Sequence, residues 1–396
     1  MTDRFFRRAV AIVAGIGLAA TSSSACGDST PTSTPPSTAP GAAVQWPAAL
    51  ATSIATSSGT WATVPMGRLG KPRDTFWQLF FRPSGGATWS NRVEATATAT
   101  NGGLVLASAG QSLAVGIRPS SGLRFSPIIA TTDAGATWTD GLLDEGLAVH
   151  PDALALDAAG HGLAVSDGLS GDEVLASAGS LSKWRELLTL GALRSTKPGK
   201  ACAARAITAV GYTDSAPAVG VSCSEPGAVG VFLYHGGAWR SVAPTLPPSV
   251  AHGTVAVLGM DTEVSRTAVV LGVAGSHGKS LIVAWTASGS SWQASPPLQL
   301  TGGEDLVSFG PAPGANVFVL LSVPGGSRRL YVTGAPAASW RRLPSPPPDT
   351  ATVAAGRAGS IDALGVNDTV LTVWTLAASS STWAKLQTTH VPVQVG

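Results

Sequence analysis

The amino-acid sequence predicts an all-β protein built from repeated units. Only 12% of its 396 residues are charged, while 47 are glycine and 28 are proline. Short apolar runs separated by such residues are typical of β-strands and turns. Trp residues also recur every 43 to 55 residues along most of the chain. A period of about 40–50 residues with one turn signature per unit predicts a β-propeller with four strands per blade.

Seven Trp residues mark the repeats, so we expect seven blades, with six or eight as alternatives. Most of them end a short stretch of Gly, Ser, Ala and Thr. They are Trp89, Trp138, Trp184, Trp239, Trp292, Trp340 and Trp383. Before the fifth, the runs 254–259, 267–273 and 280–285 predict three strands. Their continuous apolar character fits strands that neighbouring blades cover on both faces.

The most complete turn is Thr131-Thr-Asp-Ala-Gly-Ala-Thr-Trp138. Asp133 can accept hydrogen bonds from backbone N–H groups in the turn, and Gly135 permits a positive φ. Thr137 and Trp138 would begin the next strand, with the indole covering the turn. This stretch resembles the Asp-box (BNR) signature of sialidase-like propellers. The resemblance implies that the turn joins the two outer strands of a blade, and that the other six Trp residues end degraded copies of it.

The first blade has fewer recognisable strands than the others. Residues 61–64, 76–81 and 89–93 predict only three. A further apolar stretch, 390–395, follows the last Trp turn. We therefore expect this C-terminal tail to pair near the N-terminal end of the propeller and close the ring.

Residues 1–25 have the features of an export signal. Arg4, Arg7 and Arg8 precede a short apolar segment, Ala9–Ala20, and small residues follow it. Ser24-Ala25-Cys26-Gly27 resembles a bacterial lipoprotein cleavage site, although Ser23 stands where that family usually has Leu. The resemblance implies that Cys26 is lipidated and that the protein is anchored on the extracytoplasmic face of the cell membrane. Ordinary secretion is the alternative, and export by either the Sec or the twin-arginine route fits.

The rest of the chain divides into a tether and the propeller. Residues 26–45 are rich in Ser, Thr and Pro and predict a disordered tether, whereas 46–396 would form the propeller. Three arginines and one aspartate precede Cys26, and their removal leaves 22 basic and 22 acidic residues. A neutral, monomeric domain of this kind gives no electrostatic case for nucleic-acid binding. The six scattered histidines predict neither a metal site nor another cofactor.

Cys202 and Cys223 are the two cysteines that remain after Cys26. They flank two apolar runs, 206–211 and 218–221, which we interpret as paired strands of the fourth blade. Disulfides form readily in exported proteins, so we expect these two residues to be bridged. Two buried free thiols are the alternative.

The sequence favours a non-catalytic scaffold that recognises a protein or a cell-envelope glycan. The alternatives are a sialidase-like glycoside hydrolase and an assembly factor for a membrane complex. Sialidases use a Tyr–Glu nucleophile with an arginine cluster. Phe81-Arg82-Pro83 is similar to their Phe/Tyr-Arg-Ile-Pro motif but lacks the Ile, and the chain has only three tyrosines. Arginines and a Tyr–Glu pair at a mouth of the channel would favour the enzyme, whereas Ala, Ser and Gly there would favour the scaffold.

Acidic residues cluster weakly in loops between strands. The pairs are Asp144-Glu145, Asp172-Glu173 and Glu304-Asp305, with Asp152 close to the first. We expect solvated loop charges, and the sequence does not show which face they share.

Overall fold

The computed structural model describes residues 46, 50–68, 74–92, 102–118, 127–142, 151–168, 171–179, 181–213, 215–263, 266–276, 278–287, 291–312, 316–334 and 339–392. The predicted signal peptide, Cys26 and the predicted tether lie outside these residues. The compact unit of the chain is Val44–Gly396. Within the described ranges, every helix is too short or too polar to span a bilayer.

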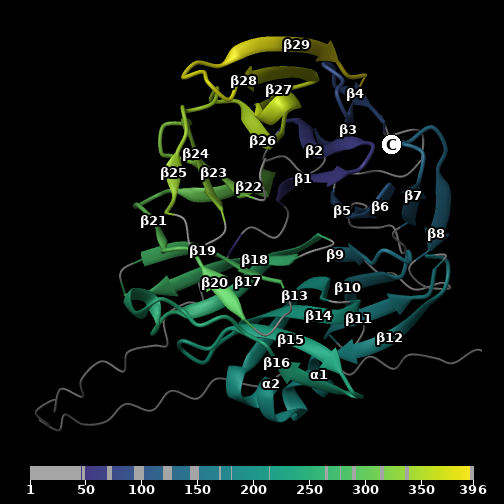
Figure 1. The fold of residues 1–396 in the computed structure, drawn as a ribbon, viewed down its shortest axis with the longest axis vertical. Coiled ribbons are helices and arrows are strands. Elements are labelled where there is room, and N and C mark those ends of the chain that lie inside the picture. The colour runs from purple at the N-terminus through teal and green to yellow at the C-terminus, as the bar shows by residue number, and fades with distance from the viewer. Residues whose placement is uncertain are drawn as a thin grey trace, which may run out of the picture. The chain divides into compact units, whose positions relative to one another are not determined.

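The protein is an all-β propeller, as the composition and the repeats predict (Figure 1). The described strands form consecutive antiparallel groups of four, which we call blades 1 to 7. Blades 1 and 2 are β1 (Ala51–Thr56), β2 (Gly59–Gly67), β3 (Thr75–Pro83) and β4 (Ser90–Asn91), then β5 (Gly103–Ala109), β6 (Ser112–Arg118), β7 (Pro127–Thr131) and β8 (Thr139–Leu142). Blades 3 and 4 are β9 (Pro151–Leu156), β10 (Gly162–Gly168), β11 (Gly171–Ser177) and β12 (Trp184–Thr189), then β13 (Ala204–Thr213), β14 (Ala216–Cys223), β15 (Gly230–His235) and β16 (Ala238–Ser241).

The remaining three blades follow the same pattern. Blade 5 is β17 (Thr254–Glu263), β18 (Arg266–Gly275), β19 (Gly278–Thr286) and β20 (Trp292–Ala294), with a short extra strand, β21 (Leu298–Leu300), beside β19. Blade 6 is β22 (Asp305–Ala312), β23 (Asn316–Ser322), β24 (Arg328–Gly334) and β25 (Arg341–Arg342). Blade 7 is β26 (Thr350–Ala355), β27 (Ile361–Asn367), β28 (Val370–Leu376) and β29 (Ala384–His390). In each blade the first strand is the innermost.

The core lies between the blades. Strand β18 is buried at every position from Thr267 to Ala274, because blades cover it from both sides. One apolar cluster joins Val165 of blade 3 to Val219 of blade 4, and another joins Phe80 of blade 1 to Leu364 of blade 7. Burial on both faces explains the continuous apolar runs in the sequence.

The expectation of a three-stranded first blade is wrong. Strand β1 completes blade 1, and it pairs with β2 and, in parallel, with β22 at Ala51↔Ser308. Its sequence, Ala-Thr-Ser-Ile-Ala-Thr, has too few large apolar residues to be recognised as a strand.

The described part of the C-terminal tail also corrects the predicted closure. His390 pairs with Val370 inside blade 7, and the Val391 N–H donates to Thr369 O. Residues 393–396 lie outside the described ranges. Each end of the ring is therefore a blade made from its own continuous segment.

A polar seam between blades 7 and 1, here called the closing seam, joins these two ends. Arg82 Nε lies 3.2 Å from Asp362 Oδ2, and both side chains are buried. Trp89 Nε1 donates to the same oxygen at 2.9 Å, and Arg82 also donates to Ala355 O at 2.7 Å. Gln387 accepts from Trp89 N and donates to Trp89 O. One backbone bridge adds to these contacts, because the Gly67 N–H at the end of β2 donates to Asp368 O between β27 and β28 at 2.8 Å. Blade 1 is thus bound to blade 7 mainly through side chains, with a single backbone bridge.

Other repeat Trp residues also bind the preceding blade. The indole N–H of each donates to a backbone carbonyl just beyond the outer strand of that blade, an arrangement we call an inter-blade Trp bond. These bonds are Trp292 to Val242 O, Trp340 to Pro296 O at 2.8 Å and Trp383 to Pro344 O at 3.1 Å. Trp184 differs, because it donates to Leu181 O of its own blade. In blades 5 to 7 the repeated Trp therefore has a structural role, because each indole joins its blade to the preceding one.

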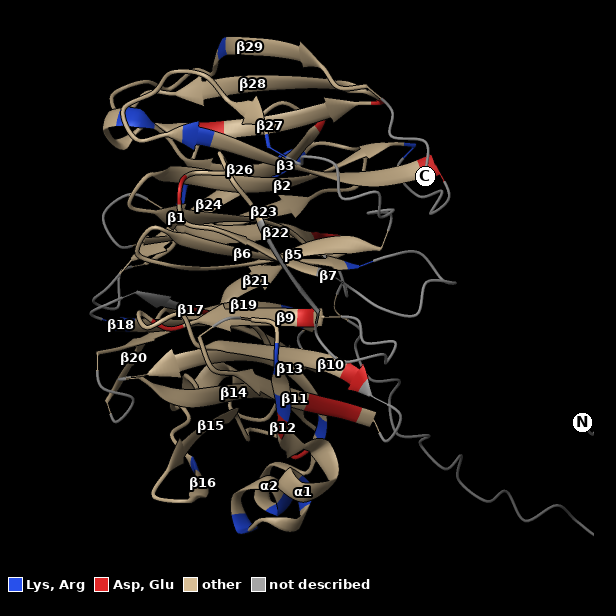
Figure 2. Cartoon of the chain, turned by 90° about the vertical axis from the view of Figure 1, so that its right-hand side faces the viewer, with Lys and Arg blue, Asp and Glu red and all other residues tan. Residues whose placement is uncertain are grey.

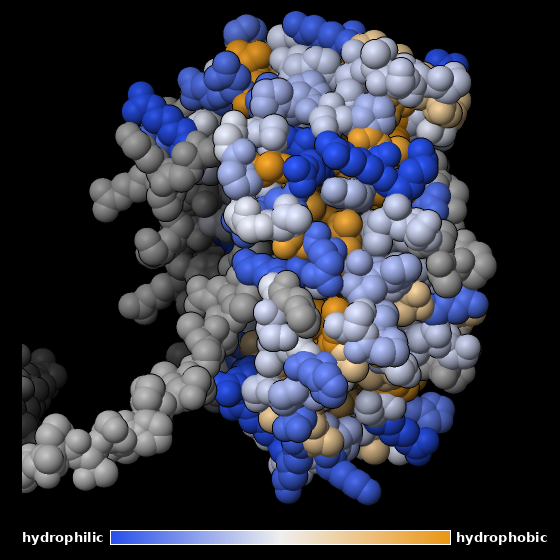
Figure 3. Space-filling model, turned by 90° about the vertical axis from the view of Figure 1, so that its left-hand side faces the viewer, coloured by the Kyte–Doolittle hydropathy of each residue, from blue (hydrophilic) through white to orange (hydrophobic). Residues whose placement is uncertain are grey.

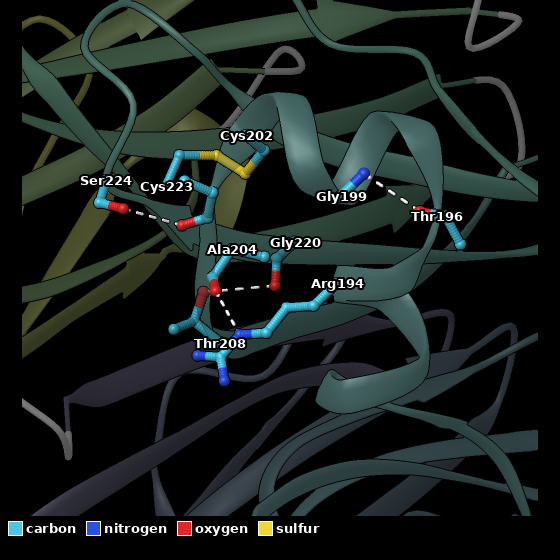
Figure 4. Close-up of a disulfide and its surroundings, with 10 residues drawn as sticks. Arg194, Thr196, Gly199, Cys202, Ala204, Thr208, Gly220, Cys223 and Ser224 are labelled. Atoms are coloured by element: carbon cyan, nitrogen blue, oxygen red, sulfur yellow. Dashed lines mark hydrogen bonds between the residues drawn. A yellow bond between two sulfur atoms is a disulfide. The ribbon is translucent and has the colours of Figure 1, made fainter.

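Two short helices interrupt the all-β pattern, and the sequence reasoning did not anticipate them. Helices α1 (Leu190–Ser195) and α2 (Lys197–Cys202) lie between β12 and β13. Thr189 and Thr196 cap them, each accepting a backbone N–H through its hydroxyl. Cys202, at the end of α2, forms a disulfide with Cys223 at the end of β14, with Cα atoms 5.1 Å apart (Figure 4). Arg194 Nε adds a bond to Ala204 O, so the insertion is fixed to blade 4 at several points.

Candidate binding site at the channel mouth

The topology gives the disc two different faces. The innermost strands all run in the same direction along the axis, so they end on one face, which we call the mouth face. They begin on the other, the opposite face. A cavity of about 620 Å³ opens at the mouth face, and residues at or just beyond the ends of β1, β5, β9, β13, β17 and β22 line it.

Small uncharged residues form much of this lining. Ala55, Ser57, Ala109, Gly110 and Ala158 all contribute. The Ser57 N–H donates to Gly110 O at 2.8 Å, and this bond fixes the turn of blade 1 to the turn of blade 2. The turn after β5 is also bonded to β1, because the Ser108 hydroxyl donates to Ala55 O at 2.8 Å. These cross-links make the wall of the cavity rigid on this side.

Three charged residues also reach the cavity: Asp157, Asp261 and Arg266. Asp157 is buried, and its Oδ1 accepts the backbone N–H groups of Ala159 and His161. Its Oδ2 lies 2.7 Å from His161 Nδ1. Asp157 therefore holds the turn after β9 in shape.

Tyr212, at the end of β13, is the tyrosine of this cavity. It is buried, and burial raises the pKa of its hydroxyl, with the nearby Asp157 carboxylate adding to the effect. A tyrosine nucleophile needs its proton removed easily. The environment of Tyr212 instead raises the pKa of its hydroxyl, so the phenol stays protonated. The backbone carbonyl oxygen of Tyr212 accepts a hydrogen bond from the Thr267 hydroxyl at 3.3 Å.

The residues that a sialidase would need do not gather at this mouth. Arg82 is buried in the closing seam. Tyr234 packs against Trp239, with ring centroids 5.2 Å apart, near the outer edge of blade 4. Tyr331 lies in an apolar cluster between blades 5 and 6. Among the described residues that line the cavity, Arg266 is the only arginine, so the arginine cluster of a sialidase does not form there.

The Thr131–Trp138 turn joins β7 to β8, the two outer strands of blade 2. Asp133 Oδ1 accepts the Thr137 N–H at 2.9 Å, and its Oδ2 accepts the Thr137 hydroxyl at 2.6 Å. Thr131 Oγ1 accepts the Gly135 N–H, and Gly135 has a φ of +79°. The two hydrogen bonds from Thr137, together with one from the Thr131 hydroxyl to Asp133 Oδ1, lower the pKa of Asp133 to about 2. The turn lies on the mouth face but outside the cavity lining, so its role is structural.

The acidic loop residues that the structure describes lie on the opposite face, at the starts of β9, β11 and β22. Asp152 pairs with Arg118 at 2.7 Å, and Asp305 lies 3.4 Å from Lys279. Asp172 accepts the Ile207 N–H, and Glu173 accepts the Ser166 hydroxyl. Each therefore has a structural partner. Asp144 and Glu145 lie outside the described residues, and nowhere in the described ranges do three or more His, Cys, Asp or Glu form a group that could hold a metal ion.

Comparisons with known proteins support the fold alone. The chain matches no protein-family model, and no curated protein is similar to it in sequence. It is similar in structure to a putative 6-phosphogluconolactonase from Bacteroides fragilis, with 11% identity over 85% of this chain and 97% of that one, at a TM-score of 0.52. A putative 6-phosphogluconolactonase from Bacteroides uniformis also has a TM-score of 0.52, with 9% identity over 84% and 97% of the two chains.

A third solved structure is YCF48 bound to D1 peptide. It has 13% identity over 86% of this chain and 96% of that one, with a TM-score of 0.45. Identities this low support no transfer of activity or ligand to this chain. The function must therefore be argued from the cavity itself.

Sequence reasoning missed the residues of the cavity. Asp157, Tyr212, Asp261 and Arg266 have no motif in common, and their spacing follows only the blade repeat. One signal was present, because Asp157 and Asp261 lie at or next to the ends of the apolar runs that form β9 and β17. Aligning the ends of all the innermost strands would have placed these residues around one opening.

Proposed function

We propose that the protein is a non-catalytic binding propeller whose ligand enters the cavity at the mouth face. The observation that carries the proposal is the cavity of about 620 Å³ formed by turns from six blades. Ligand sites are usually concave, preformed and lined by mostly apolar groups with a few polar ones. The small residues and the few charged groups of this mouth fit that description.

The chemistry of the mouth supports binding rather than catalysis. The buried Tyr212 keeps its proton, because burial and the Asp157 carboxylate raise the pKa of its hydroxyl. Asp157 itself is occupied by two backbone N–H groups and by His161. Groups whose hydrogen bonds are already satisfied shape a site but do not readily exchange protons with a substrate.

The second part of the proposal concerns the cellular location of the protein and the chemical class of its ligand. A lipid on Cys26 would anchor the chain at the extracytoplasmic face of the membrane, and the Asp-box resemblance of Thr131–Trp138 links the domain to propellers with that turn. The ligand in this proposal is a protein or a glycan of the cell envelope. Metabolic labelling with an alkyne-modified fatty acid tests the anchor, because wild-type protein should take up the label and Cys26→Ala should not.

The mouth is tested by capture from the protein's own envelope. Full-length protein and two variants would be used as bait, and retained material would be identified by mass spectrometry. Ala158→Trp places an indole at the cavity, whereas Ala378→Trp places one on an exposed turn of blade 7. We expect a stoichiometric ligand on the wild type and on Ala378→Trp, and at least tenfold less on Ala158→Trp.

Equal retention by all three proteins would refute the mouth as the binding site. If the wild type cleaved the ligand and Ala158→Trp did not, the protein would be a hydrolase rather than a scaffold. Circular dichroism of each variant checks that a loss of binding is not a loss of fold.

A further inference from the structure

Basic residues recur at one position of the propeller that the mouth cavity does not use. They stand one or two residues after a repeat Trp, on the outer strand of the blade. They are Arg185 of β12, Arg240 of β16, Arg341 and Arg342 of β25, and Lys385 of β29. All five are exposed. We call this set the cation ring, and part of it is visible in Figure 2 as basic colour on β16 and at the start of β29.

The topology places the cation ring around the mouth face. The outer strand of each blade runs antiparallel to the strand before it and starts at the mouth face. Residues at its start therefore lie at the outer edge of that face, while the cavity lies at its centre. The ring extends over blades 3, 4, 6 and 7, with one or two positive charges on each.

Few acidic residues lie in the described strands that carry these charges. In the four outer strands, five cations accompany a single carboxylate, Glu186. Two basic residues of the opposite face, by contrast, are paired, Arg118 with Asp152 and Lys279 with Asp305. Within the described part of the chain, no ion pair involves a member of the cation ring. In a domain with equal numbers of acidic and basic residues, this is a marked local excess.

We propose that the cation ring binds an anionic polysaccharide that extends across several blades around the cavity. The inference rests on the proposed function in one respect, which is that the domain faces the cell envelope. The cations are spread over four blades and do not converge on one point, so a single small anion could not contact them together. A flexible polymer with repeated carboxylates or phosphates could contact them in succession, and each contact releases counterions.

A protein ligand fits this rim less well. Protein interfaces depend on a central cluster of buried aromatic or aliphatic residues. Among the described residues, Leu386 is the only exposed large hydrophobic side chain, at 39%. Figure 3 shows mostly hydrophilic colours on the rim at the side of blades 5 to 7, with apolar residues in separate small areas.

The half-buried Trp184, Trp239, Trp340 and Trp383 offer apolar surface close to the cations in sequence. Aromatic rings of this kind can pack against the apolar faces of sugar rings. The rim therefore offers separate cations and partly exposed indoles, which is a combination suited to a charged glycan.

The test measures binding of full-length protein in detergent to polygalacturonate, with neutral dextran as the uncharged comparison. Arg341→Glu/Arg342→Glu reverses two charges of the ring. Lys197→Glu/Lys200→Glu reverses two exposed charges of α2, on the opposite face, and changes the net charge by the same amount. We expect salt-sensitive binding to polygalacturonate and none to dextran. The ring variant should bind at least tenfold more weakly, and the α2 variant within threefold of the wild type.

Three results would overturn the proposal. They are an absence of polygalacturonate binding at 0.1 M salt (about physiological ionic strength), equal weakening by both variants, and tighter binding to polyglutamate than to polygalacturonate. The last would assign the ring to an acidic peptide. A failure here would leave the mouth proposal intact if Ala158→Trp still abolishes capture. Conversely, an Ala158→Trp variant that binds polygalacturonate normally separates the ring from the cavity.

Discussion

The closing seam and the seams between blades 4, 5, 6 and 7 solve the same problem with different chemistry. In the seams between blades 4, 5, 6 and 7, an indole N–H donates to a neutral backbone carbonyl of the preceding blade. In the closing seam, Trp89 donates instead to the Asp362 carboxylate, which also faces the buried Arg82. Successive blades are already joined by the chain, whereas blades 7 and 1 are not. The comparison indicates that charge-assisted side-chain bonds, together with the Gly67–Asp368 backbone bridge, hold the ring closed where the chain does not.

The largest expected effect comes from removing one partner of the buried pair. Asp362→Ala leaves Arg82 buried without its counter-ion, and such changes destabilise proteins by about 3–5 kcal/mol. Urea unfolding should show this loss in the free energy of unfolding. As a control, Asp305→Ala removes an exposed partner of Lys279 and should change it by about 1 kcal/mol or less.

A double variant separates charge from packing in the closing seam. Arg82→Met/Asp362→Leu removes both charges, and apolar replacement of a buried pair is often neutral. We expect it to recover much of the stability that Asp362→Ala loses. If the single variant were as stable as the wild type, the closing seam would not depend on this ion pair.

Loss of the disulfide of blade 4 should have the next largest effect on stability. This bridge is covalent, whereas the closing seam is held by non-covalent bonds. Cys202 and Cys223 are 21 residues apart, and closing such a loop contributes roughly 3 kcal/mol in the chain-entropy model. Cys202→Ser/Cys223→Ser should lower the free energy of unfolding by about this amount, as should reduction of the wild type. The double variant should be insensitive to dithiothreitol, and a continued response to the reductant would contradict the assignment.

The Trp bonds themselves allow a direct comparison of the two kinds of seam. Trp→Phe keeps much of the apolar ring and removes the N–H. At Trp340 the lost bond has a neutral acceptor and should lower stability by about 1 kcal/mol, whereas at Trp89 the acceptor is charged and the loss should be about 1.5–3 kcal/mol. Equal losses in thermal unfolding would mean that the carboxylate adds nothing to the closing seam.

The smallest effect is expected at the Asp133 turn, whose hydrogen bonds lie within blade 2, although its Trp138 also packs against Trp61 of blade 1. Its folded pKa of about 2 is below the ordinary value of 3.8, so ionised Asp133 stabilises the turn above about pH 4. That contribution disappears as the pH falls through about 2. Carboxyl-carbon NMR titration should give the lowered pKa, and Thr137→Ala should move it upward by removing a hydrogen-bond donor. An ordinary pKa in the wild type would contradict the turn geometry.

Much of the fold was predictable because it depends on local patterns that repeat. The Trp residues, the Thr131–Trp138 turn and the apolar runs of blade 5 each specify a strand or turn without reference to distant residues. Cys202 and Cys223 belong to the same group, because the strands that bring them together are neighbours in sequence. The propeller followed from the number and spacing of these features.

The parts that sequence reasoning missed depend on contacts between distant segments. Strand β1 has a weak local signal and is stabilised by pairing with β2 and β22. The partners of Arg82 include Ala355 and Asp362, which are more than 270 residues away in sequence. Helices α1 and α2 are too short for a clear apolar period and are fixed by caps, Arg194 and the disulfide. The cavity was invisible for the same reason, since it exists only where six turns meet.

Hydrogen exchange tests the central claim, that the mouth face binds a ligand, most directly. Exchange would be measured by mass spectrometry for full-length protein in its own membranes and after purification in detergent. The account predicts slower exchange in the membranes for the turns after β1, β5 and β9, with the turn between β23 and β24, on the opposite face, unchanged. Equal exchange at these turns in both preparations, or protection confined to the opposite face, would contradict it.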